Sequence, residues 1–138
     1  MKMTRLLTII CLSSICAAAL ADGPVSKITP AELFDDLSAG EPDPVVLDVR
    51  TPEEFAAGHV PGAMNIPHDQ IAERIASLEP ARGAELVVYC RSGRRSAIAS
   101  DVLRQAGFDN VRHLAGDMQG WQAAELPLET EQPIPSVR

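Results

Sequence analysis

Several kinds of residue are scarce in this sequence, and each shortage excludes a class of protein. Of 138 residues only three are cysteine, and the aromatic set is one tryptophan, one tyrosine and three phenylalanines. So few aromatic rings, with no basic residues interleaved among them, do not form the stacking platform of single-strand nucleic-acid binders. Lysine and arginine number 12 against 19 acidic residues, which gives a net charge of −7. Such a chain repels phosphate backbones, so we expect no nucleic-acid partner.

Two of the three cysteines, Cys11 and Cys16, lie in a segment that has the pattern of a secretory signal. A short basic start precedes the apolar run 6–20, and Ala19-Leu20-Ala21 matches a small-residue cleavage pattern. An uncleaved anchor is the alternative, but the run is shorter than the roughly 20 residues that span a bilayer. We therefore predict removal of residues 1–21, export to the bacterial periplasm or beyond the cell, and no membrane contact afterwards.

Removal of the signal leaves 117 residues and a single thiol, Cys90. No intramolecular disulfide is then possible, and the length fits one domain with a core of its own. We predict a domain over residues 22–128 and a flexible tail over 129–138, where prolines and polar residues gather. We expect a monomer or a weak dimer.

Helix and strand signals alternate along this domain. A capping box with proline at the first helical position occurs at 29–32 and again at 51–54, and Gly40 and Gly58 end the two helices. Apolar runs predict strands at 45–49, 63–66, 86–89 and 111–114. Apolar stripes predict helices at 69–78 and between Cys90 and Gly107. Buried strands separated by helices predict an α/β fold with a mostly parallel sheet.

Cys90 follows the predicted strand 86–89 directly. In parallel sheets the carboxyl ends of the strands form the ligand crevice, so the thiol lies where ligands bind. The next residues are Arg91, Ser92, Gly93, Arg94, Arg95 and Ser96. Loop amides, a helix N-terminus and three guanidinium groups each stabilise a thiolate. An isolated cysteine is more often a small buried apolar residue, but the arginines favour a nucleophile that attracts a small anion, with Gly93 permitting close approach of the backbone.

Asp48 and Arg50 follow another predicted strand, 45–49. They are either a charged pair at the mouth of the site or a structural ion pair that ties the strand end to Glu54, and the structural interpretation is favoured. The three histidines, His59, His68 and His113, share no metal-ligand spacing, so we predict no metal site.

Taken together these motifs resemble the rhodanese family of sulfurtransferases, over residues 28–121. The resemblance rests on the segments 47–50, 53–55, 58–67, 88–96 and 114–121. It implies a five-stranded parallel sheet flanked by helices on both faces, with loop amides around the cysteine sulfur and no metal or organic cofactor. One departure is Asp117, where the family often has glycine, and we expect it to alter the rim of the site.

The resemblance also implies a reaction. Cys90 is the nucleophile that takes the outer sulfur of thiosulfate as a persulfide and passes it to cyanide or a thiol. The residues implied to bind the substrate are Arg91, Ser92, Gly93, Arg94 and Arg95. Those implied to support the site are Asp48, Arg50 and Ser96.

Two other functions fit parts of the pattern. Cysteine phosphatases and arsenate reductases use a Cys-x5-Arg loop, but the sixth residue after Cys90 is Ser96, so the pocket should be too small for a tetrahedral oxyanion. The other alternative is a non-catalytic, redox or persulfide-carrier module that binds a protein partner. An intact cysteine loop argues against a purely non-catalytic module.

Overall fold

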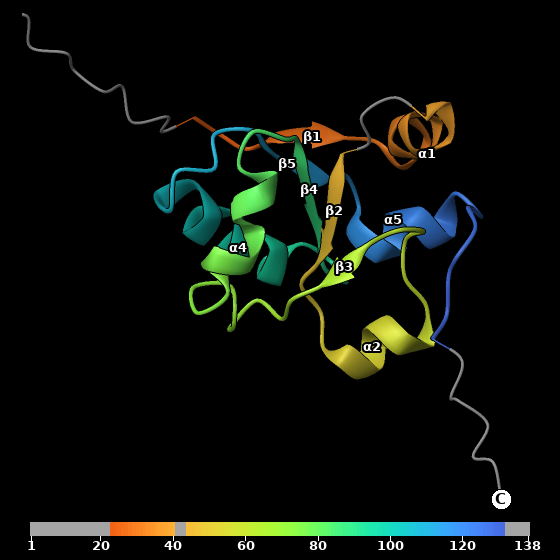
Figure 1. The fold of residues 1–138 in the computed structure, drawn as a ribbon. Coiled ribbons are helices and arrows are strands. Elements are labelled where there is room, and N and C mark those ends of the chain that lie inside the picture. The colour runs from red at the N-terminus through yellow and green to blue at the C-terminus, as the bar shows by residue number, and fades with distance from the viewer. Residues whose placement is uncertain (1–22, 41–43, 132–138) are drawn as a thin grey trace, which may run out of the picture.

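Five parallel strands form the centre of the molecule, for which a computed structural model describes residues 23–40 and 44–131. The predicted signal, 1–21, and residues 132–138 of the predicted tail lie outside the described residues. The strand order is β1-β5-β4-β2-β3, with β4 in the middle (Figure 1). The strands are β1 (Ser26–Ile28), β2 (Val45–Asp48), β3 (Met64–Asn65), β4 (Leu86–Tyr89) and β5 (Val111–Leu114). The predicted α/β class and five-stranded parallel sheet are confirmed; the sequence patterns located every strand except β1.

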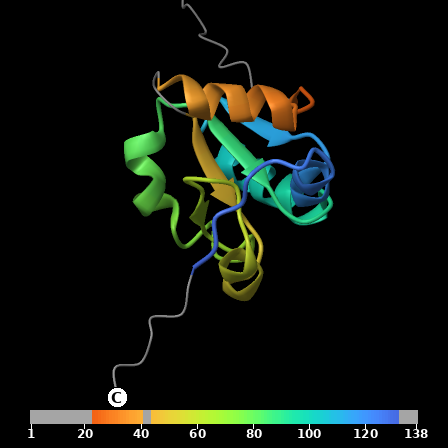
Figure 2. The same cartoon turned by 90° about the vertical axis from the view of Figure 1, so that its right-hand side faces the viewer.

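Helices cover both faces of this sheet, as Figures 1 and 2 show, with α4 on the face opposite α1 and α5. The α-helices are α1 (Pro30–Ala39), α2 (Pro52–Ala57), α3 (Ile75–Leu78), α4 (Arg94–Gln105) and α5 (Asp117–Ala123). Both predicted capping boxes form, on Thr29 with Glu32 and on Thr51 with Glu54. Each satisfies amide donors that a helix start leaves without partners.

The helix predicted over residues 69–78 is helical only at α3. Residues 69–74 form turns instead, in which the Arg74 amide donates to the carbonyls of both Gln70 and Ile71. Arg74 occupies the cap position of α3 and provides no side-chain hydrogen bond there. The apolar stripe was therefore a correct sign of burial, since Ile71 and Leu78 are buried, but it did not show that residues 69–74 form a regular helix.

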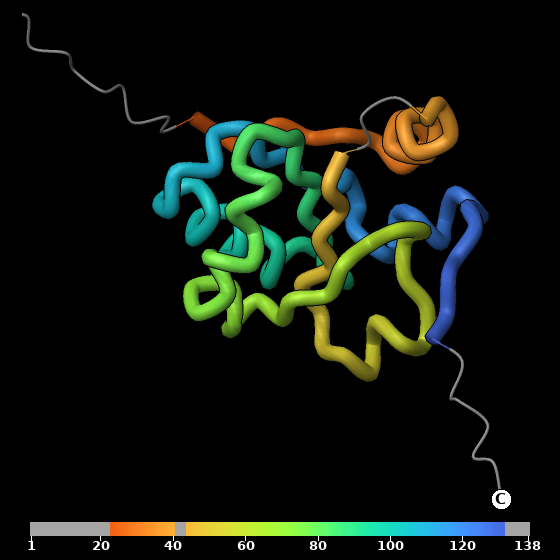
Figure 3. Tube along the Cα trace, viewed as in Figure 1, coloured from red at the N-terminus to blue at the C-terminus, as the bar shows by residue number. Residues whose placement is uncertain are grey.

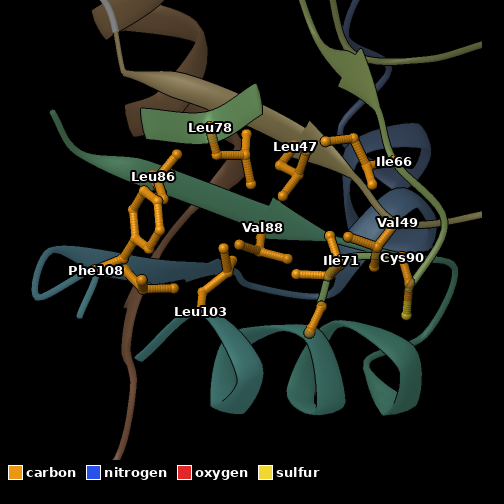
Figure 4. Packing of buried hydrophobic residues seen from close by; sticks show 12 residues of the cluster. Leu47, Val49, Ile66, Ile71, Leu78, Leu86, Val88, Cys90, Leu103 and Phe108 are labelled. Carbon is orange, nitrogen blue, oxygen red and sulfur yellow. The ribbon is translucent and has the colours of Figure 1, made fainter. Parts of the chain in front are cut away.

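Alternate residues of β4 enter two separate apolar clusters. Leu86, Val88 and Cys90 point to the cluster that includes Ala99 and Leu103 of α4. The intervening residues, Val87 and Tyr89, point to the cluster beneath α1 and α5, which contains Leu33 and Trp121. Figure 4 shows Cys90 at the end of the first row of core side chains, beside Val49, with its sulfur toward the α4 side. The period of two along the strand thus aims the thiol at the helix that follows it.

The first residues of the predicted tail are paired with the segment after α2, as Figure 3 shows along the chain trace. His59 and Glu129 exchange both backbone hydrogen bonds at 2.9 Å, and the Gly62 amide donates to the Glu129 carboxylate at 3.0 Å. Within residues 23–40 and 44–131 no helix combines the length and apolar content that a bilayer crossing requires.

Candidate active site

Cys90 lies immediately after β4, at the carboxyl end of the central strand, and only 1% of its surface is exposed. The crevice predicted at that end of the sheet follows from parallel pairing: β2 and β4 end side by side, with Asp48 opposite Tyr89. The chain then turns through residues 91–93 and enters α4 at Arg94.

The sulfur accepts a hydrogen bond from the loop and lies near a hydroxyl of the first turn of α4. The Gly93 amide lies 3.1 Å from Cys90 Sγ, and the Ser96 hydroxyl oxygen lies 3.6 Å from it. Gly93 is the cap residue of α4 and has φ +110°, a conformation that residues with a side chain rarely adopt. Among the described residues Gly93 is the one backbone donor to the sulfur, whereas the sequence predicted several such amides from 91 to 95.

We expect Gly93→Ala to slow alkylation of Cys90 by iodoacetamide about tenfold, because a hydrogen bond to a charged group contributes roughly 1.5–3 kcal/mol. An added Cβ would lie 3.3 Å from Asp117 Oδ2 in a strained backbone conformation, so the Gly93 amide would turn away from the sulfur. Gly83→Ala is the matched control, since a Cβ there meets nothing within 4 Å. An alkylation rate equal to that of Gly83→Ala would contradict this role of the amide.

The three arginines of the loop differ in their surroundings. Arg91 and Arg94 are exposed, whereas Arg95 is half-buried and makes a two-pronged ion pair with Glu54 at 2.6 and 3.0 Å. Glu54 raises the pKa of Arg95, and the Cys90 sulfur contributes in the same direction. Arg95 is therefore the loop arginine whose position an ion pair fixes, and the sequence did not single it out.

The Glu54–Arg95 pair should make stability depend on pH. The Arg95 guanidinium lowers the pKa of Glu54 from its ordinary value of 4.5 to about 2. A lowered carboxyl pKa stabilises the fold above pH about 4.5, and this contribution is lost as pH falls toward 2. We expect Arg95→Gln to lower the urea midpoint relative to wild type at pH about 6 and to have a much smaller effect at pH about 2.5. Arg91→Gln is the control, and a pH-independent effect of Arg95→Gln would refute the coupling.

Asp48 and Arg50 are buried beside Tyr89, the residue that precedes Cys90. The Arg50 guanidinium donates twice to the Asp48 carboxylate and once to the Gly58 carbonyl, and the Tyr89 hydroxyl donates to Asp48 at 2.7 Å. Arg50 thus pairs with Asp48 rather than with Glu54, which corrects the structural partner that the sequence suggested. Burial raises the pKa of Tyr89, so its phenol stays a donor. The cluster fixes the residue that precedes Cys90.

Sequence reasoning did not predict the roles of two polar residues at the site. Asp117 was expected at the rim, but its exposed fraction is 3%, and it lies behind the loop with its carboxylate on the Cys90 amide at 2.8 Å. His113 of β5, which had no expected role, lies 2.9 Å from both the Asp117 carboxylate and the Ser96 hydroxyl. The signal that could have found Asp117 was its position directly after Gly116, where the family pattern often has a second glycine.

Ser92 and Ser96 also differ. Ser92 is exposed on the loop, whereas Ser96 is buried and its hydroxyl lies 3.0 Å from the Gly93 carbonyl and 2.9 Å from Asp117 Oδ1. The structure therefore brings Cys90, Gly93, Arg95 and Ser96 together, leaves the other loop residues at the surface, and places Asp48 and Arg50 beneath them.

Comparison with known proteins agrees with this geometry. A family model described as "Rhodanese-like domain" matches residues 29–124. A crystal structure of a rhodanese-related protein from Thermoplasma volcanium superposes with a TM-score of 0.66 at 33% identity, covering 75% of this chain and 97% of that one.

Three curated relatives differ in their printed functions. An HTH-type transcriptional regulator of Mycobacterium tuberculosis is 39% identical over 88% of this chain, and the match spans 52% of that protein. The thiosulfate sulfurtransferase PspE of Escherichia coli is 40% identical over 51% of this chain and 67% of its own length. A sulfurtransferase of Allochromatium vinosum is 36% identical over 75% of this chain and 94% of its own length. The relatives thus include two sulfurtransferases and a regulator that is about twice as long as the matched region.

Proposed function

Because this chain belongs to the rhodanese-like family, we propose that it is a sulfurtransferase that moves the outer sulfur of thiosulfate through a persulfide on Cys90 to cyanide or a thiol. The observation that carries the proposal is the surroundings of the Cys90 sulfur. It accepts the Gly93 amide at 3.1 Å at the start of α4, beside the half-buried Arg95. These groups favour a thiolate, which is the nucleophilic form of cysteine.

The proposed reaction has two steps. The Cys90 thiolate attacks the outer sulfur of thiosulfate, an Sγ–S bond forms, and the sulfur–sulfur bond of thiosulfate breaks with its electron pair leaving on sulfite. The acceptor, cyanide or a thiolate, then attacks the outer sulfur of the persulfide. The Sγ–S bond breaks, and its electron pair returns to Cys90. No proton or external reductant is needed in either step.

Residues of the loop support both steps. The Gly93 amide donates to the sulfur and so stabilises negative charge on the thiolate that attacks and on the thiolate that leaves. Arg91 and Arg94, exposed at the rim, attract the dianionic donor, and Arg95 offsets charge on the departing sulfite. Charge neutralisation of this kind is the largest contribution that such a small site can make.

Phosphate chemistry is less well supported. A phosphatase loop has its closing arginine at the sixth residue after the cysteine. In this chain that residue is Ser96, whose hydroxyl is directed to the Gly93 carbonyl and the Asp117 carboxylate.

Steady-state kinetics test the proposal. With thiosulfate and cyanide we expect thiocyanate to form with ping-pong kinetics, because the persulfide separates the two half-reactions. Thiosulfate that yields no sulfite, together with tight binding to a protein partner, would instead support the non-catalytic module.

The donor preference is a separate expectation. Since arginines suit a compact dianion better than a monoanionic keto acid, kcat/KM for thiosulfate should exceed that for mercaptopyruvate about tenfold or more. Changing Arg91 and Arg94 together to glutamine should lower kcat/KM for thiosulfate more than for mercaptopyruvate. Equal losses for the two donors would contradict the binding role of the rim arginines.

The pattern of residues 1–21 leads us to propose the bacterial periplasm as the place of this reaction. That location makes exported thiols or small anions the accessible acceptors.

A further inference from the structure

Asp117 has a backbone conformation that suits glycine better than aspartate. Its φ is +54°, in the left-handed region, and a residue with a side chain pays about 1–2 kcal/mol there. It is also 3% exposed, although burial of a carboxylate is costly unless the group is well hydrogen-bonded. Two unfavourable features at one position indicate that the side chain makes contacts that offset them.

Those contacts join three segments around the Cys90 loop. Asp117 Oδ1 accepts the Cys90 amide at 2.8 Å and lies 2.9 Å from the hydroxyl oxygen of Ser96 in the first turn of α4. Asp117 Oδ2 lies 2.9 Å from His113 Nε2 of β5. Burial alone would raise the pKa of Asp117, but the hydrogen bonds from His113 and from the Cys90 amide hold it below its ordinary value. The Asp117 carboxylate is therefore an ionised acceptor, and His113 Nε2 donates a hydrogen bond to it.

The N-terminus of α5 holds the same loop through its backbone. The Met118 amide donates to the Cys90 carbonyl at 3.0 Å, and the Gln119 amide donates to the Arg91 carbonyl at 3.3 Å. Both polar backbone groups of Cys90 are therefore bound by α5, one through the Asp117 side chain and one through Met118. Gly93, at the opposite end of the loop, also lies close to Asp117. A Cβ added at Gly93 would be 3.3 Å from Asp117 Oδ2.

We propose that Asp117 is a positioning residue for sulfur transfer: by holding the Cys90 amide and the Ser96 hydroxyl on one carboxylate, it sets the loop so that the Gly93 amide faces the sulfur. This inference rests on the proposed function and names a residue that the reaction needs without touching the substrate. Pre-organised donors cost no rearrangement when charge develops. A loop released from Asp117 has to rearrange at each step of the reaction.

The sulfur is surrounded by a balanced set of charges. Arg95 faces it from α4 with Glu54 behind from α2, and His113 from β5 lies against Asp117. The hydrogen bond from His113 therefore draws part of the Asp117 carboxylate charge away from the sulfur. This arrangement allows a carboxylate to position an anionic nucleophile without a large repulsion.

Four variants test the proposal. Asp117→Ala and Asp117→Gly remove the acceptor, and we expect kcat with thiosulfate and cyanide to fall about 30-fold while KM for thiosulfate changes less than about twofold, because the arginines are untouched. Asp117→Asn keeps an oxygen acceptor for Cys90 and should restore most of kcat. Asp101→Ala, an exposed position on α4, is the control. Glycine adopts a positive φ without strain, so a loss of kcat in Asp117→Gly at an unchanged melting temperature is not a folding defect.

A second measurement separates this inference from the proposed function. The rate of Cys90 alkylation by iodoacetamide requires no sulfur donor, and it should fall in the Ala and Gly variants and be largely retained in Asn. If the wild-type chain transfers no sulfur, the proposed function fails, while the alkylation series still decides the role of Asp117. Wild-type kcat and alkylation in Ala and Gly would overturn the inference, and so would a loss in Asn as large as that in Ala.

Discussion

Cys90→Ser should abolish sulfur transfer from thiosulfate, with a loss of more than about 10⁴-fold, the scale observed when a covalent nucleophile is removed. A serine hydroxyl can accept the Gly93 amide as the sulfur does, and it differs little in size, so the buried site is retained. The hydroxyl is not ionised near neutral pH, and it forms no persulfide. The loss therefore comes from chemistry rather than from structure.

Thiocyanate formation measures this loss, and circular dichroism verifies that the variant is folded. Ser100→Ala is a suitable control, because the Ser100 hydroxyl is buried on α4 without a hydrogen-bond partner among the described residues. Turnover by Cys90→Ser within tenfold of this control would mean that another group carries the sulfur.

Asp48→Ala should lower the free energy of unfolding by about 3–5 kcal/mol, because removal of one member of a buried ion pair leaves the other charge uncompensated. Arg50 is 6% exposed, and without Asp48 its guanidinium retains only the Gly58 carbonyl as a hydrogen-bond acceptor among the described residues. The Tyr89 hydroxyl also loses the carboxylate to which it donates. Urea denaturation at neutral pH measures the change.

Glu79→Ala provides the matched comparison, since Glu79 also pairs with an arginine, Arg82, but at the surface. Exposed ion pairs contribute little to stability, so its urea midpoint should stay near that of wild type. A similar small effect for Asp48→Ala would show that the Asp48 cluster is not a structural support of the site.

Local sequence patterns predicted the fold well because its signals are local. The capping boxes at Thr29 and Thr51 fixed the starts of α1 and α2, and apolar runs located β2 and β4. β1 escaped notice because only Ile28 of its three residues is buried, so no apolar run marks it. The helix expected from residue 69 failed because an apolar stripe marks burial, which turns can provide as well as a helix.

The position of Cys90 at the end of β4 was predictable, and the residues around it were not. Cys90, its helix and the basic loop are contiguous in the sequence, so their proximity follows from chain connectivity. Glu54 lies 41 residues from Arg95 and Asp117 lies 27 residues from Cys90, and these pairs depend on how the strands and helices pack. The change of partner from Arg50 to Arg95 for Glu54 has the same origin. Local patterns predicted that Cys90 and the basic loop lie together, whereas packing decides which charged side chains surround them.

The most direct test of the account follows a single sulfur atom. The protein is incubated with thiosulfate that carries a heavy isotope in its outer position, without an acceptor, and the peptide that contains Cys90 is weighed before and after addition of cyanide. We expect one labelled sulfur on Cys90 and its complete appearance in thiocyanate once cyanide is added. An unlabelled Cys90 peptide, or a label that cyanide does not remove, would contradict the claim that this thiolate carries sulfur between a donor and an acceptor.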